Sequence, residues 1–140
     1  MIRTRSARAL AGGLIVAVGI VFATGADAAV IKRFSGKTSQ HQPISFQVAH
    51  GYVTHMEFKI LDTCPNGHVW QIHDFGFEKI HINRSHAFNQ LFSSKSSRAT
   101  ARISGKVSRK RVTGKITERR FIGKEHHFCN GSATFALAAK

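Results

Sequence analysis

From residue 30 onward, apolar and polar residues alternate with a period of two along most of the chain. Clear examples are Ile44, Phe46 and Val48, then Met56, Phe58 and Ile60, and finally Ala133, Phe135 and Leu137. No stretch in this part keeps a 3.6-residue apolar stripe over three turns, which is the pattern of an amphipathic helix. Because successive side chains of a strand point to opposite faces, the pattern predicts half-buried β-strands.

Turn-forming residues interrupt the alternation at intervals of about 8–12 positions, which is typical of an all-β sandwich or barrel. His50-Gly51, Pro65-Asn66-Gly67 and Ser108–Arg111 are three such interruptions. The expected strands lie near residues 31–38, 43–49, 52–63, 68–75, 77–82, 86–92, 98–107, 111–121 and 127–139. Short links without helical crossovers favour antiparallel pairing. We therefore expect an all-β fold, an antiparallel meander of eight or nine strands forming a sandwich or a small up-and-down barrel.

Two local departures from the alternation carry further expectations. Val53 has the opposite parity to Met56, which predicts a β-bulge around Thr54-His55. Gly105 and Gly114 lie inside strand patterns, in the similar segments Ile103–Val107 and Val112–Ile116. Glycine within a strand indicates a bend, a bulge or close packing of a neighbouring ring.

The first 28 residues have the pattern of a helical secretory signal peptide. Arg3, Arg5 and Arg8 precede an apolar run from Ala9 to Ala23, and Ala26-Asp27-Ala28 forms an A-x-A cleavage signal. The run of about 15 residues is shorter than the roughly 20 that span a bilayer. We expect cleavage after Ala28, a single β-domain over residues 29–140 without a transmembrane segment, and a secreted or extracytoplasmic location. An uncleaved membrane anchor is the alternative.

The two cysteines, Cys64 and Cys129, predict one disulfide, because an even count in an exported chain indicates pairing. Cys64 shares parity with Phe58 and Ile60, and Cys129 shares parity with Phe135. Both sulfur atoms therefore point inward if these apolar sets do. The bridge would place their Cα atoms within about 7 Å of each other, and the last strand beside or opposite the third.

The chain is strongly basic, with 21 Lys and Arg against 7 Asp and Glu. Residues 29–140 keep 18 of these basic and 6 of these acidic residues, a formal charge of +12. Such a balance favours anionic partners. An anionic polysaccharide or cell-envelope polymer is the expected partner, and export makes genomic nucleic acid an unlikely one.

The basic residues gather on one predicted hairpin, over residues 98–120. If Ile103, Val107, Val112 and Ile116 face inward, the cations between them share the outer face and the turn. The predicted polyanion-binding residues are Arg102, Lys106, Arg109, Lys110, Arg111, Lys115 and Arg119. Such a one-sided stripe can bind a polyanion and release counterions. The alternative is a solvated face that protects exposed strands from aggregation. Aromatic residues are absent from the expected outer face, so base stacking is not predicted.

Motifs for catalysis or for metal and cofactor binding are lacking. Histidine pairs such as His50/His55 and His68/His73 are five residues apart, which places the rings on opposite faces of an extended strand. A site from separate strands, for example His73, Asp74 and His126, has no local sequence support. The carboxylates form no evident pair for hydrolysis. We expect no catalytic residues, no metal and no cofactor.

A resemblance covers nearly all of the chain after the signal peptide. It is carried by Phe34–Gln40, Pro43–Val48, the Cys64 turn, the late strand pair with [ST]-G-[KRT] segments, and Cys129 before a final strand. In these features the chain resembles uncharacterised small exported β-proteins of high-GC Gram-positive bacteria. The group has no assigned activity, so the resemblance implies a style of fold and a compartment but no residue roles.

Two functional hypotheses follow. The first is an exported non-enzymatic β-domain that binds an anionic envelope or matrix polymer through the basic hairpin. The second is a carrier of a small apolar ligand, with the meander closed into a barrel around an apolar cavity. A cavity of several hundred Å³ lined by phenylalanine would favour the carrier, whereas a filled interior would favour the first hypothesis.

Overall fold

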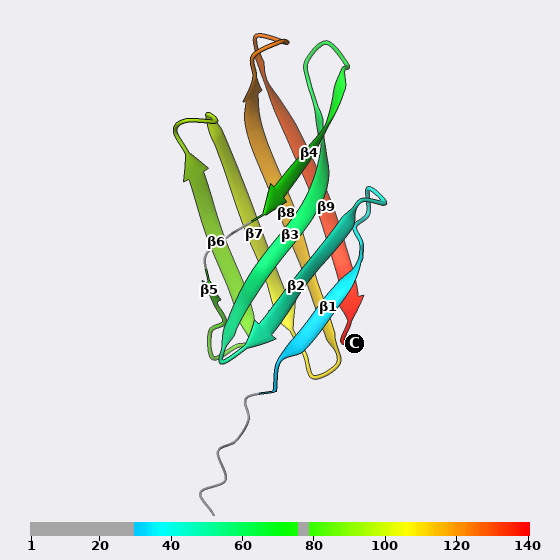
Figure 1. Cartoon of the computed structure of the whole chain (residues 1–140), viewed down its shortest axis with the longest axis vertical. Coiled ribbons are helices and arrows are strands. Elements are labelled where there is room, and N and C mark those ends of the chain that lie inside the picture. Colours follow the sequence, from blue (N-terminus) through cyan, green and yellow to red (C-terminus); the bar gives the residue numbers. More distant parts are fainter. Residues whose placement is uncertain (1–29, 76–78) are drawn as a thin grey trace, which may run out of the picture.

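The structure of the protein is a computed structural model that describes residues 30–75 and 79–140, all of it strands and connecting turns (Figure 1). The strands are β1 (Lys32–Lys37), β2 (Pro43–Ala49), β3 (Tyr52–Thr63), β4 (Val69–Phe75), β5 (Ile80–His81), β6 (Ala87–Ser94), β7 (Ala99–Val107), β8 (Arg111–Ile122) and β9 (His127–Ala138). The all-β prediction is confirmed. The expected ranges agree to within two residues, except for β5, which is shorter than predicted. The predicted signal peptide lies outside the described residues.

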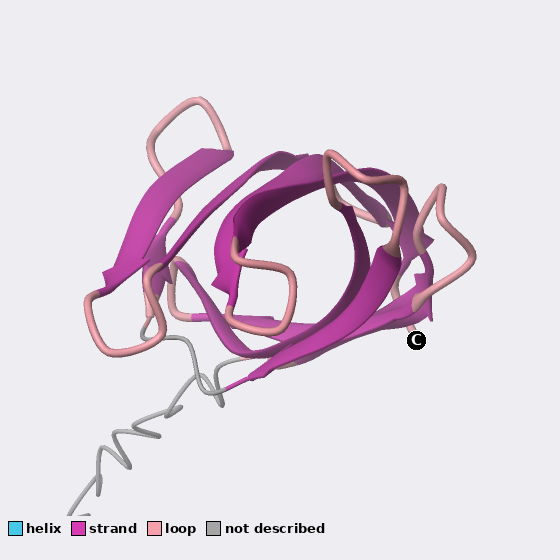
Figure 2. Cartoon of the chain, turned by 90° about the horizontal axis from the view of Figure 1, so that it is seen from above, coloured by secondary structure: helices cyan, strands magenta, loops and turns pink. Residues whose placement is uncertain are grey.

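All strand pairs are antiparallel and belong to one sheet. Neighbours follow chain order in two runs, β1-β2-β3 and β6-β7-β8-β9, and β3 joins the two runs by pairing with β9 through Asp62 and Thr63. The other edge of β3 carries β4 and β5. The sheet curls around the core (Figure 2), but its path of paired strands does not close. Because the path is open, the fold is not the closed up-and-down barrel that the sequence left as an alternative.

The β1–β2 turn fills the wedge where β3 and β9 diverge. The side chain of Gln40 pairs with the backbone of Leu61 in β3, donating from Nε2 to the carbonyl (3.0 Å) and accepting the amide on Oε1 (2.8 Å). On the other side, the Ser39 amide donates to the Thr134 carbonyl of β9 (2.8 Å), and the Thr134 amide donates to Ser39 Oγ (2.9 Å). The turn thereby satisfies backbone groups that no strand reaches at this point.

The predicted bulge lies in β3. Register shifts between Ser45 and Gln47 of β2, so that β3 has one extra residue between Thr54 and Glu57. His55 lies in this stretch with φ of 51°, a left-handed conformation that is uncommon outside glycine. The extra residue lets both Val53 and Met56 face the core, and each is at most 1% exposed.

The interior is filled mainly by aromatic and branched side chains. The Phe46 ring contacts those of Phe34 and Phe135, with centroids 5.4 and 5.9 Å apart, respectively. Gly105 and Gly114 are cross-strand partners of each other. A Cβ on Gly105 would collide with the Phe88 ring, and one on Gly114 with the Phe135 ring. The two strand glycines thus make room for aromatic rings, the third of the expected alternatives.

The disulfide prediction is confirmed. Cys64 and Cys129 are bonded, with their Cα atoms 4.2 Å apart. Both residues are buried at one end of the sheet, where β3 ends and β9 begins. The bond closes a loop of 65 residues and reinforces the short β3–β9 pairing, which joins the two runs of strands.

Candidate functional site: the outer face of β6–β9

The outer surface of β6–β9 is a continuous basic face. Each cation lies beside uncharged residues of the neighbouring strands. The cross-strand partners are Thr117 and Leu91 for Arg102, Ser104 and Thr134 for Lys115, and Thr100 and Asn130 for Arg119. Lys106 continues the same row toward the β7–β8 turn. We call Arg102, Lys106, Lys115 and Arg119 the basic face; all four are exposed. No outward position of these four strands carries an acid, because Glu118 points to the core.

A groove of about 480 Å³ runs across this face. Its cations are Arg102, Lys115 and Arg119, and hydroxyl and amide side chains from β7, β8 and β9 lie between them. Arg102 donates from Nη1 to Asn89 Oδ1 (3.1 Å), which holds one guanidinium along the groove. The arrangement offers several donors to an extended anionic ligand.

The predicted binding residues separate into two groups. Arg102, Lys115 and Arg119 line the groove, whereas Arg109, Lys110 and Arg111 lie at the β7–β8 turn, at the opposite end of the ribbon (Figure 1). The turn is held by neighbouring strands: Lys32 Nζ donates to the Arg109 carbonyl (3.1 Å), and the Ala139 amide donates to the Lys110 carbonyl (3.0 Å). Lys106 lies between the groups.

Aromatic rings do occur at one corner of the outer face, contrary to the sequence expectation. Phe121 and Phe128 are cross-strand partners, with centroids 5.4 Å apart. The Arg119 guanidinium carbon lies 4.2 Å from the Phe128 centroid, and that of Arg98 lies 3.9 Å from the Phe121 centroid. This corner was not predicted, although the outward parity of Lys115 and Arg119 continues to Phe121 two residues later.

The cations of the basic face lack carboxylate partners. Within residues 30–75 and 79–140, the ion pairs of arginine involve Arg120 alone, which contacts Asp74 and Glu118 on the inner side of the sheet. The remaining ion pairs are His68–Glu125 and His73–Glu57. The outer charges are therefore neutralised by water and mobile ions, which an anionic ligand can displace.

On the inner side of the same strands, the sheet encloses an inner carboxylate cluster: Asp62, Asp74, Glu118 and Arg120. Arg120 donates from Nε to Glu118 Oε1 (2.6 Å) and from Nη2 to Asp74 Oδ1 (2.7 Å). Asp62 and Glu118 are 0% and 3% exposed, and both are cross-strand neighbours of Gly131. A Cβ at residue 131 would collide with Asp62 Oδ1, so glycine there leaves room for the carboxylate.

No carboxylate pair was evident in the sequence, whereas the structure brings Asp62, Asp74 and Glu118 together around Arg120. The sequence does contain a signal that these carboxylates face inward. Asp62 has the same strand parity as Ile60 and Cys64, and Glu118 has the same parity as Ile116. Burial raises the pKa of Asp62 to about 6, opposed by nearby Arg120. The pKa of Glu118 is raised to about 8; burial is the largest cause and a hydrogen bond with Asp74 is the second. Neither Asp62 oxygen nor Glu118 Oε2 has a hydrogen-bond partner in the described structure.

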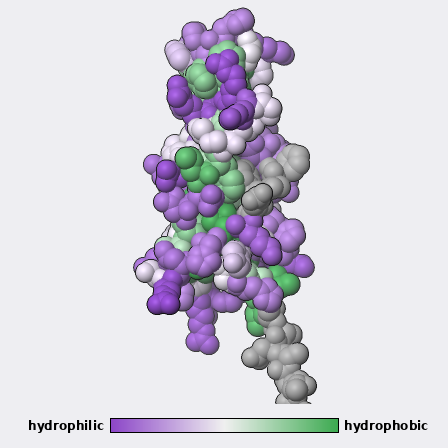
Figure 3. Space-filling view, turned by 90° about the vertical axis from the view of Figure 1, so that its left-hand side faces the viewer, coloured by the Kyte–Doolittle hydropathy of each residue, from purple (hydrophilic) through white to green (hydrophobic). Residues whose placement is uncertain are grey.

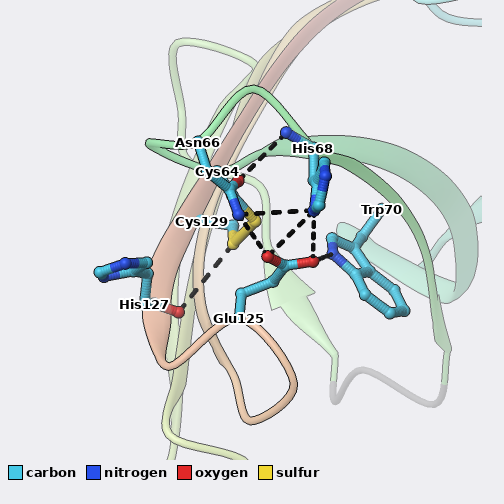
Figure 4. Close-up of polar contacts among 7 residues, drawn as sticks. All are labelled: Cys64, Asn66, His68, Trp70, Glu125, His127 and Cys129. Atoms are coloured by element: carbon cyan, nitrogen blue, oxygen red, sulfur yellow. Dashed lines mark hydrogen bonds and ion pairs between the residues drawn. A yellow bond between two sulfur atoms is a disulfide. The ribbon is translucent and has the colours of Figure 1, made fainter.

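A second polar cluster clamps the two turns beside the disulfide (Figure 4). The Glu125 carboxylate, from the β8–β9 turn, accepts from Asn66 Nδ2 (2.5 Å) and Trp70 Nε1 (3.0 Å), and lies 2.9 Å from His68 Nδ1. These contacts lower the pKa of Glu125 to about 2, with the Asn66 hydrogen bond as the largest cause. The cluster joins the β3–β4 and β8–β9 turns across Cys64–Cys129. It has the geometry of a structural clamp.

Histidines occupy most of the left-handed backbone positions, in turns and in the β3 bulge. Five of the six non-glycine residues with positive φ among those described are histidines, namely His41, His50, His55, His86 and His126. His73 contacts Glu57 (2.7 Å), whereas the adjacent Asp74 binds Arg120. His73, Asp74 and His126, which no local sequence feature combines, form no shared metal site. The described part of the chain contains no group of three His, Cys, Asp or Glu side chains placed to hold a metal ion.

Comparisons with known proteins give no relative. No protein-family model, no curated protein and no solved structure matches the chain. Within the described residues, no helix is long and apolar enough to cross a membrane. The candidate site therefore rests on its own geometry.

Proposed function

We propose that this protein is an exported, non-enzymatic β-domain that binds an anionic polymer, such as an envelope polymer or an acidic polysaccharide, along the basic face. The observation that carries the proposal is the groove in which Arg102, Lys115 and Arg119 are exposed without carboxylate partners. Its one acidic lining residue, Glu118, is 3% exposed and pairs with Arg120 on the inner side. If the exposed cations served only to keep the strands solvated, they would not need to share one groove.

The shape of the basic face suits an extended ligand. Between Arg119 and Arg111, β8 advances eight residues, roughly 27 Å at about 3.4 Å per residue. Lys106 and Lys115 lie between these ends on neighbouring strands, so cations occur along the whole ribbon. A linear polyanion can contact several of them at once, whereas a small anion would contact only one or two.

An oxidising compartment fits the same proposal. A buried disulfide, Cys64–Cys129, closes the junction between β3 and β9, and such bonds persist in secreted and cell-surface proteins. Envelope and matrix polymers are the abundant polyanions of that environment. The signal-peptide pattern of residues 1–28 would deliver the domain there.

Retention on immobilised heparin or on a cell-wall resin tests the proposal. The domain should elute later than expected for a neutral protein of its size, and retention should fall as salt rises. The variant R102S/K115S/R119S, which removes the groove cations, should lose most of this retention. The variant R109S/K110S/R111S should lose less, because the turn contacts only one end of an extended ligand.

A matched control separates the face from net charge. The variant K37S/K79S/R84S also removes three exposed cations, all outside β6–β9, and should retain wild-type binding. Equal losses in the groove variant and this control would show that retention reports net charge alone, and the proposal would be abandoned.

The carrier hypothesis lacks a supporting observation. Four pockets lined by described residues have volumes of about 320–480 Å³, and each of these four is lined by more polar than apolar residues. The surface over β5 and β6 is mostly hydrophilic, with small separate hydrophobic patches (Figure 3). The interior contains packed Phe34, Phe46 and Phe135 rings in the region that a ligand would occupy.

A further inference from the structure

A second pocket, of about 320 Å³, adjoins the basic groove at the β6–β7 turn. We call it the turn pocket; the residues that concern us are Ser93, Lys95, Arg98, Thr100, Arg119 and Phe128. Arg119 and Thr100 line both the groove and the turn pocket. Three cations and three hydroxyl side chains, those of Ser93, Ser94 and Thr100, surround the space, and no acidic residue lines it. Its volume lies at the lower end of the range for small-molecule sites.

The backbone of Arg98 is held in an unusual conformation. Its φ is 45°, a left-handed value that non-glycine residues adopt only where the surrounding structure maintains it. Two backbone hydrogen bonds do so here: the Arg98 amide donates to the Lys95 carbonyl (3.3 Å), and the Arg98 carbonyl accepts from the Phe121 amide (3.1 Å). The turn is thus fixed to β8, and Arg98 leaves it toward the Phe121 and Phe128 rings.

Both guanidinium groups lie over aromatic rings. Arg98 lies 3.9 Å from the Phe121 centroid and 5.3 Å from that of Phe128, and Arg119 lies 4.2 Å from the Phe128 centroid. A guanidinium carries its N–H donors in its plane, so stacking occupies its face and leaves its edges available. Neither arginine has a carboxylate within 4 Å among residues 30–75 and 79–140.

We propose that the turn pocket binds a tetrahedral oxyanion, a phosphate or sulfate group, between the guanidinium edges of Arg98 and Arg119, with Lys95 as a third cation. Arginine forms bidentate hydrogen bonds with such groups, and the Thr100 and Ser93 hydroxyls can donate to the remaining oxygens. The inference rests on the proposed function in one respect: it makes the polymer on the basic face a phosphate or sulfate ester. The pocket would anchor one ester group while the groove contacts the chain beyond it.

Titration with inorganic phosphate and inorganic sulfate, at constant ionic strength, tests the pocket without any polymer. Arginine Nε–H NMR resonances of the intact domain report on each guanidinium separately. The resonances of Arg98 and Arg119 should shift with saturation, whereas Arg84, Arg109 and Arg111 should shift weakly and linearly. Acetate should bind about tenfold more weakly, because it offers two oxygens and one charge. Saturation by phosphate alone would identify phosphate esters, and by sulfate alone sulfate esters.

Variants of Arg98 test the turn pocket separately from the basic face, because Arg98 lies outside that face. Asparagine tolerates the left-handed conformation, so R98N should fold and should bind the oxyanions about tenfold more weakly. R98K should fall between R98N and wild type, since it keeps the charge and loses the planar donors. Equal, unsaturable shifts at every arginine, or unchanged affinity in R98N, would overturn the inference. The salt-dependent heparin retention would still test the proposed function independently.

Discussion

Strand β8 has charged residues on both faces, and the two faces differ in how that charge is compensated. On the inner face, Arg120 contacts Glu118 and Asp74 at 2.6 and 2.7 Å. On the outer face, Lys115 and Arg119 have no acidic partner in the described structure and line a groove. The inner charges compensate one another in ion pairs, whereas the outer charges are available to a ligand. Pairing therefore distinguishes a structural charge from a candidate binding charge more reliably than charge density does.

The largest expected effect comes from removing the only cation of the inner cluster. Arg120→Ala leaves Asp74 and Glu118 without their shared donor, and breaking a buried ion pair in this way costs about 3 kcal/mol or more. Arg102→Ala, on the outer face of neighbouring β7, should change the free energy of unfolding by less than about 0.5 kcal/mol. Urea unfolding measures both. Similar losses in the two variants would contradict the distinction between the faces.

The pH dependence of stability should also reveal the inner cluster. Folding raises the pKa of Asp62 from 3.8 to about 6 and that of Glu118 from 4.5 to about 8, so the folded state holds these protons more tightly than the unfolded state. Their contribution is fully present below about pH 4 and is lost as pH rises through 6 and then 8. This component should lower the free energy of unfolding between pH 5 and pH 9.

Glu118→Gln tests the assignment, because the amide cannot ionise. The variant should lose much of the decline above pH 6, while Glu57→Gln, whose parent side chain is 56% exposed, should keep it. Urea unfolding at pH 5, 7 and 9 provides the comparison. An unchanged slope in the Glu118 variant would assign the pH dependence to other groups.

A smaller effect of opposite sign is expected at the turn clamp. The pKa of Glu125 is lowered from 4.5 to about 2, so its contribution to stability is present above pH 4.5 and is lost as pH falls toward 2. Glu125→Gln should therefore be less stable than wild type at pH 6, and the difference should shrink at pH 2.5. Thermal unfolding at both values measures the effect. A constant difference would mean that the carboxylate charge plays no part in the clamp.

Most of the fold could be predicted from the sequence because its determinants are local. Alternation located the strands, the parity break between Val53 and Met56 located the bulge, and shared inward parity supported the disulfide. The β3–β9 pairing beyond the disulfide and the insertion of Gln40 could not be predicted. Both features depend on the divergence of β3 and β9, which leaves backbone groups unpaired. No local sequence pattern indicates where this divergence occurs.

The candidate site was predicted in part. The sequence indicated that Arg102, Lys106, Lys115 and Arg119 share a face, because strand parity and hairpin register are short-range properties. It did not indicate that Arg98 stacks on Phe121, since this contact depends on the path of the β6–β7 turn. The inner cluster was missed for a different reason: inward parity was applied to the apolar residues and was not extended to Asp62 and Glu118.

Lysine footprinting of the wild-type domain tests the central claim most directly. Lysines are acetylated with and without saturating heparin, and protection is read by mass spectrometry at each site. We expect strong protection of Lys106 and Lys115, on the basic face, and unchanged reactivity of Lys37, Lys59 and Lys79, on other strands and turns. Uniform protection of all five, or protection confined to the latter three, would contradict the assignment of the outer face of β6–β9 as the polyanion-binding surface.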